Sequence, residues 1–119
     1  MLTSVLEGPG YLVTEASDPR QALEILSAAR YDLVLSDLHL LKRGGSIGLL
    51  REVREMYHHC RVVVMATYGD IGTALQAVRE GAHDFVTKPV DPDHLLRIVN
   101  QALRDPTGRV KPILSASEY

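Results

Sequence analysis

Short apolar runs alternate along this chain with stretches of helical periodicity. The runs are continuous rather than alternately apolar and polar, which is typical of strands that are buried on both faces of a sheet. The sequence predicts four such strands, at residues 11–14, 32–36, 61–65 and 84–86. The first of them is the weakest, and it follows the turn signal Gly8-Pro9-Gly10.

Helices are predicted between these strands, and two of them begin with an aspartate followed by proline. Asp18-Pro19 and Asp91-Pro92 each combine a capping residue with the residue that suits the first helical position. Two further helices are expected over residues 46–57 and 70–80, the second of them ended by Gly81. Because strands and helices alternate, the sequence predicts a parallel sheet with helices on both faces.

Residues suited to phosphoryl chemistry follow three of the predicted strands. In sheets of this class the ligand site lies at the carboxyl ends of the strands, where Asp37, Thr67 and Lys88 stand. The Asp37 carboxylate can act as an oxygen nucleophile towards phosphorus. Lys88 can place a positive charge, and Thr67 a hydroxyl, beside the phosphoryl oxygens. Either charged residue alone is better explained by a strand end or a solvated surface, but their combination favours a phosphoryl-transfer site.

Composition and charge exclude several classes of function. A formal net charge of −2 gives no electrostatic case for nucleic-acid binding. The single cysteine, Cys60, excludes an intrachain disulfide and fits a reducing compartment. No apolar run approaches the roughly 20 residues that a membrane span needs, and the N-terminus lacks the positive region of a signal peptide. We therefore expect a soluble cytoplasmic protein without a membrane partner.

From Tyr11 to Arg104 the sequence resembles the receiver domain of response regulators. Residues 31–38, which contain the second predicted strand, are similar to the family's third strand. That strand ends in the phosphoacceptor, which is Asp37 here. Residues 81–89 are similar to the fifth strand, which is followed by a lysine–proline pair, and Gly45 matches a loop glycine of the family. The resemblance implies a doubly wound, flavodoxin-like fold over residues 1–104, with 105–119 as a tail or linker stub.

The same resemblance implies the activity. A receiver domain of a two-component phosphorelay accepts a phosphoryl group on its aspartate from a histidine kinase or a phosphotransfer protein, with Mg²⁺ as cofactor. It is a phosphoacceptor and not an enzyme in the usual sense. Phe85 falls on the aromatic position whose rotamer reports phosphorylation, although simple core packing explains this residue equally well. The face formed by the helix near residue 70, the Phe85 strand and the last helix is the one such domains use for dimerisation or output.

The largest departure from the family is at the start of the chain. The family opens with a central strand that ends in two adjacent acids, whereas this sequence begins within what resembles the family's first helix. We therefore expect four strands instead of five, either paired directly or left with an exposed edge. Our hypothesis is that the reading frame has lost its start or that the chain is a fragment. Asp37 and the backbone carbonyl of His39 would then be the only metal ligands, which predicts poor affinity for Mg²⁺.

Two smaller departures lie near the predicted site. The family's switch hydroxyl falls on Ala66, so that Thr67, one residue later, is the only replacement at hand. Leu41 stands where the family has a proline, which predicts a less rigid loop after Asp37.

The sequence also allows other interpretations. A degenerate receiver could act as an interaction module that does not depend on phosphorylation. A nucleotide- or flavin-binding enzyme on the same fold lacks support, because Gly69, Gly72 and Gly81 do not have the spacing of a dinucleotide fingerprint. The residues His58-His59-Cys60 are interpreted as a solvated loop, since adjacent residues rarely converge on one metal ion.

Overall fold

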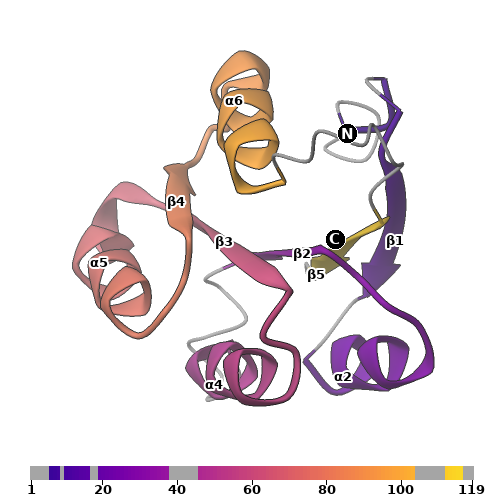
Figure 1. Ribbon diagram of the computed structural model, residues 1–119. Helices are drawn as coiled ribbons and strands as arrows, with labels where there is room; N and C mark the ends of the chain where they lie inside the picture. Colours follow the sequence, from indigo (N-terminus) through magenta and orange to yellow (C-terminus); the bar gives the residue numbers. More distant parts are fainter. Residues whose placement is uncertain (1–5, 9, 17–18, 38–45, 104–111, 117–119) are drawn as a thin grey trace.

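A parallel sheet of five strands, covered by helices on both faces, forms the fold (Figure 1). The computed structural model describes residues 6–8, 10–16, 19–37, 46–103 and 112–116. The strands are β1 (Leu12–Ala16), β2 (Leu33–Asp37), β3 (Arg61–Ala66), β4 (Asp84–Thr87) and β5 (Pro112–Ala116), and their order in the sheet is β1-β5-β2-β3-β4. The described helices are α2 (Pro19–Ala28), α4 (Ser46–Met56), α5 (Ile71–Arg79), which follows the short 3-10 turn η1 (Tyr68–Asp70), and α6 (Pro92–Ala102).

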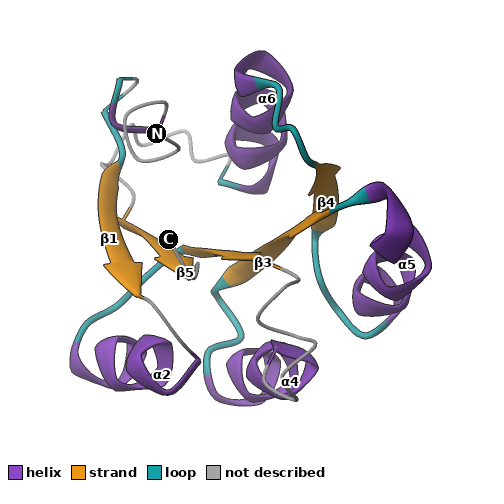
Figure 2. Cartoon of the chain, turned by 180° about the vertical axis from the view of Figure 1, so that it is seen from behind, coloured by secondary structure: helices purple, strands orange, loops and turns teal. Residues whose placement is uncertain are grey.

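The strands bury both of their faces, as the continuous apolar runs predict. Side chains of successive residues point to opposite faces of a sheet, so Val34 packs in the cluster beneath α2, α4 and α5, and Leu33 and Leu35 pack in the cluster beneath α6. Figure 2 shows α6 on one side of the sheet and α2, α4 and α5 on the other. We call these two sides the α6 face and the three-helix face.

Capping chemistry explains where α6 begins and where α5 ends. The Asp91 side chain accepts a hydrogen bond from the backbone N–H of Asp93 at 3.0 Å, and Pro92 holds the first helical position. Gly81 follows α5 with a φ of 117°, a left-handed conformation that favours glycine. The predicted boundaries of these helices therefore hold to within about one residue, and β1 lies one or two residues further along than predicted.

The prediction of four strands is wrong, because the sheet contains a fifth strand drawn from the predicted tail. β5 lies between β1 and β2 and runs parallel to both. Its residue Ile113 pairs with Val13 on one side and Leu33 on the other, and both Ile113 and Leu114 are fully buried. β1 and β2 were expected either to pair directly or to leave an edge exposed. They do neither, because β5 pairs with both of them. The boundary at residue 104 and the absence of an acidic pair stay predictions.

Tertiary context rather than local propensity makes 112–116 a strand. Pro112 cannot donate a hydrogen bond to a ladder, but proline is tolerated at the first residue of a strand, which is its place here. The segment thus takes the mid-sheet position that the resemblance assigns to the family's first strand. None of the helices in the described residues is long and apolar enough to cross a membrane.

Candidate functional site

Asp37 and Lys88, the two residues predicted to form the site, are in direct contact. Asp37 is the last residue of β2, and Lys88 follows the end of β4. The Lys88 ammonium donates a hydrogen bond to Asp37 Oδ2, with Nζ and Oδ2 2.5 Å apart. Only 2% of the Asp37 side chain is exposed, against 30% of the Lys88 side chain. A carboxylate buried to this degree requires such a partner, because an unpaired buried charge is strongly unfavourable.

The backbone of β3 helps Lys88 to reach Asp37. β3 lies between β2 and β4, so the strands that carry the two residues are about 10 Å apart, or two strand spacings. The Lys88 backbone N–H donates to the carbonyl of Ala66, the last residue of β3, at 2.8 Å. This bond holds the lysine backbone against the end of β3, from which its long side chain spans the remaining gap. The Lys88–Pro89 peptide bond is cis.

Ala66 and Thr67, the predicted switch positions, lie at the end of β3. Ala66 is buried, and it pairs in register with Thr87 of β4. The Thr67 hydroxyl donates to Asp70 Oδ2 at 2.8 Å, within the turn that leads into α5. The proton of this hydroxyl is therefore used inside its own loop, and the role of Thr67 at the phosphoryl group stays a prediction.

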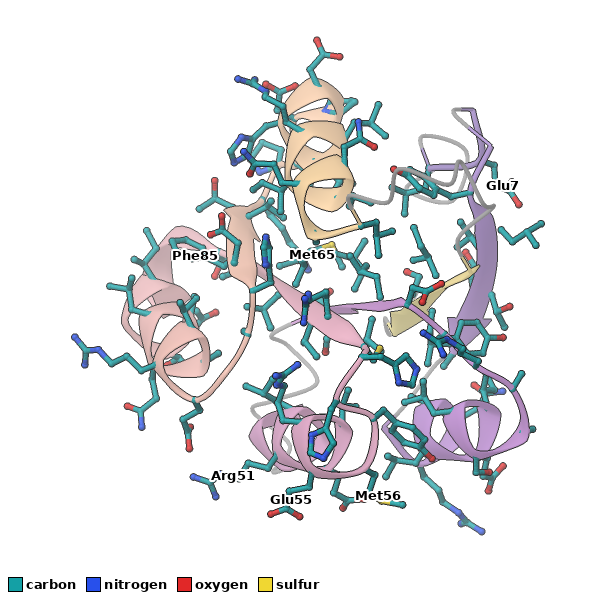
Figure 3. The ribbon with its side chains drawn as sticks, viewed as in Figure 1. Glu7, Arg51, Glu55, Met56, Met65 and Phe85 are labelled. Atoms are coloured by element: carbon teal, nitrogen blue, oxygen red, sulfur yellow. The ribbon has the colours of Figure 1, made fainter. Side chains whose placement is uncertain are left out.

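Phe85 lies in β4 and packs against the core of the three-helix face. Met65 of the neighbouring strand belongs to the cluster of the α6 face, so the two side chains lie on opposite sides of the sheet (Figure 3). Phe85 is half-buried, which core packing explains by itself. Its predicted part in a phosphorylation switch stays a prediction.

The described residues do not by themselves fit a Mg²⁺ site. Mg²⁺ requires near-octahedral coordination by oxygen atoms, and in the described part of the chain no group of three or more His, Cys, Asp or Glu side chains could hold a metal ion. Asp37 offers a carboxylate, but His39, the other predicted ligand, lies outside the described residues.

Cys60 lies inside the core, whereas its neighbours His58 and His59 are exposed. Loss of solvation raises the pKa of the Cys60 thiol to about 12, and the nearby negative charge of Asp32 adds to this increase, while Arg54 and Arg61 partly oppose it. A thiol that stays protonated is a poor metal ligand and a poor nucleophile. The interpretation of His58-His59-Cys60 as a solvated loop therefore holds for the two exposed histidines and is wrong for Cys60, whose side chain packs in the core.

The buried thiol makes a prediction about stability at alkaline pH. Above pH 9 or so the unfolded chain loses the Cys60 proton, while the folded chain keeps it up to a pKa of about 12. Stability should therefore fall as pH rises through this window, by at most about 1.4 kcal/mol per pH unit from this group. Urea unfolding of the native chain and of Cys60→Ala, at about pH 8.5 and 10.5, should show the smaller loss in the variant. Equal losses in both proteins would contradict the burial of the thiol.

The comparisons with known proteins assign the chain to a family. The family model of the response regulator receiver domain matches residues 1–100, so the chain belongs to this family. It is 36% identical over 103 residues to the transcriptional regulatory protein ZraR of Escherichia coli, a match that covers 87% of this chain and 23% of ZraR. It is 34% identical over 100 residues to the response regulator protein PilR of Pseudomonas aeruginosa, which covers 82% of this chain and 22% of PilR.

Solved structures show the same likeness. The receiver domain of NtrX from Brucella abortus superposes with a TM-score of 0.80 at 30% identity, over 86% of each chain. A response regulator from Chloroflexus aurantiacus gives a TM-score of 0.79 at 28% identity, over 88% of this chain and 87% of the other. The chain spans about a quarter of the length of the curated relatives it matches. It is a receiver domain of the two-component type, and the alternative of a phosphorylation-independent module is not favoured.

The sequence did not reveal two contacts near the site. The bond from Lys88 to the Ala66 carbonyl involves only backbone atoms, so no residue type signals it. The contact between Thr67 and Asp70 could have been found, because a hydroxyl residue followed three positions later by an acid is a recurring pattern at helix starts.

Proposed function

We propose that Asp37 accepts a phosphoryl group from a phosphohistidine of a histidine kinase or phosphotransfer protein. An Asp37 carboxylate oxygen attacks phosphorus, the O–P bond forms as the P–N bond breaks, and the leaving imidazole takes up a proton. The contact between Lys88 Nζ and Asp37 Oδ2 at 2.5 Å is the observation that carries this proposal.

Lys88 supports the transfer through its position. Charge in the transition state of phosphoryl transfer is spread over the three equatorial oxygens, and fixed cations stabilise it. An ammonium that already contacts the carboxylate lies within reach of a phosphoryl oxygen bound to that carboxylate. The resulting aspartyl phosphate would keep this cation as its partner.

Phosphorylation by a small phosphodonor tests the proposal directly. The native chain is incubated with phosphoramidate or acetyl phosphate, with and without Mg²⁺, and its intact mass is measured. We expect a gain of one phosphoryl group that hydroxylamine removes, because an acyl phosphate is cleaved by this nucleophile. Peptide mapping should then place the hydroxamate on Asp37.

Two aspartate-to-asparagine variants provide the control. Asp37→Asn should show no mass gain, whereas Asp93→Asn, which changes an exposed aspartate of α6, should gain mass like the native chain. A native chain that stays unmodified, or an Asp37→Asn chain that gains the same mass, would overturn the proposal.

A homodimer through α5, β4 and α6 is a further proposal that rests on the family resemblance. Leu75 of α5 is 46% exposed, which supplies an apolar side chain on one element of this face.

A further inference from the structure

An interior strand of the sheet, β5, comes from a part of the chain that is remote in sequence from both of its neighbours. β1 and β2 are successive strands joined through α2, yet β5 lies between them (Figure 1). In the described residues β1 pairs only with β5, while β2 pairs with β5 and β3. Without β5, no strand pairing would connect β1 to the rest of the sheet.

The contacts of β5 define what this position accepts. Ile113 packs in the cluster of the α6 face, and Leu114 packs in the cluster of the three-helix face. Both are fully buried, and the next residue, Ser115, is 5% exposed between Glu15 and Leu35 in the register of the sheet. The position therefore selects an extended segment with an aliphatic residue for each face, followed by a small residue.

Both neighbours also offer backbone hydrogen-bonding groups. All five residues of β1, from Leu12 to Ala16, are in register with β5, and so are the first four residues of β2. Addition of an extended peptide to such strand edges is a general mode of peptide recognition, in which backbone bonds give affinity and alternate side chains give specificity. Here two edges flank the same segment.

We propose that the gap between β1 and β2 is a strand-binding site whose ligand is an extended peptide with the chemistry of residues 112–116. The chain fills the site with its own segment. The site also binds that segment as a separate peptide, parallel to β1 and β2. No other described element lies beyond β5 in sequence, so a cut between α6 and β5 separates the ligand and leaves the remaining described connections intact.

A cut in the folded full chain tests this proposal. A protease recognition sequence is inserted between Gly108 and Arg109, the folded protein is cleaved, and native mass spectrometry measures whether fragment 109–119 stays bound. We expect a one-to-one complex that exchanges its fragment for an isotope-labelled synthetic peptide of residues 109–119. The same peptide with Leu114→Asp should exchange at least 100-fold less, because a charge would enter the core.

Each outcome decides for or against the site. Loss of the fragment on cleavage overturns the proposal, whether or not the remaining chain stays folded, and so does equal exchange of the Leu114→Asp peptide. A dimer in which each copy supplies the strand of the other supports the site, since the segment then binds in trans. Hydrogen exchange on the uncut native chain is an independent measurement: protection of Leu114 like that of Val63 in β3 supports the site, and free exchange overturns it.

Discussion

Leu114→Ala, in the interior strand β5, is expected to lower the free energy of unfolding by about 3–5 kcal/mol. The leucine side chain is fully buried in the core cluster of the three-helix face, to which β2 and β3 also contribute side chains. Because β5 is hydrogen-bonded to a strand on each side, the backbone around the new cavity cannot collapse to fill it. A small domain has a total stability of about 5–15 kcal/mol, so this single change should remove roughly a fifth of it or more.

A matched leucine in the edge strand controls for composition and strand propensity. Leu12 of β1 is 63% exposed, and Leu12→Ala should change stability by no more than about 0.5 kcal/mol. Urea unfolding followed by circular dichroism measures both variants, and the slope with denaturant should stay that of the native chain. If Leu114→Ala were as mild as Leu12→Ala, residues 112–116 would not be an interior strand of the sheet.

The contrast between β3 and β5 shows what the sequence could predict about the sheet. β3 carries the run Val62-Val63-Val64, which favours a buried strand by itself. β5 has only Ile113 and Leu114 between Pro112 and Ser115, and this is too little to predict a strand. Its structure depends on two strand edges that are distant in sequence, and such a dependence is invisible to local propensity.

The site was predictable to the extent that strand ends determine it. Asp37 ends one parallel strand and Lys88 follows another, and the carboxyl ends of such strands meet at one edge of the sheet. Their contact also requires the order of the strands, which places β3 between them, and the bond from Lys88 to the Ala66 carbonyl. These features belong to the assembled sheet, so the sequence predicted the two residues but not the path of the lysine.

The second large effect is expected at Lys88, because its ammonium is the cation in contact with the Asp37 carboxylate. Lys88→Met keeps a long unbranched side chain and removes the charge. Loss of one preorganised group that stabilises the transition state costs a factor on the order of 100–1000 in rate. We therefore expect phosphorylation of Asp37 by a small phosphodonor to slow by this factor, as measured from intact mass against time. Arg97→Met, which removes an exposed cation from α6, should leave the rate unchanged.

A double variant separates the catalytic role of Lys88 from its structural one. Lys88→Met deprives the buried Asp37 carboxylate of this cation and should lower stability by roughly 1–3 kcal/mol, towards the lower end because Lys88 is 30% exposed. In Asp37→Asn/Lys88→Met the carboxylate charge is also gone, so most of the lost stability should return. If Lys88 only stabilised the fold, the rate per folded molecule of the single variant would equal that of the native chain. A slow rate in fully folded Lys88→Met, together with the stability regained in the double variant, would assign the ammonium to the transfer itself.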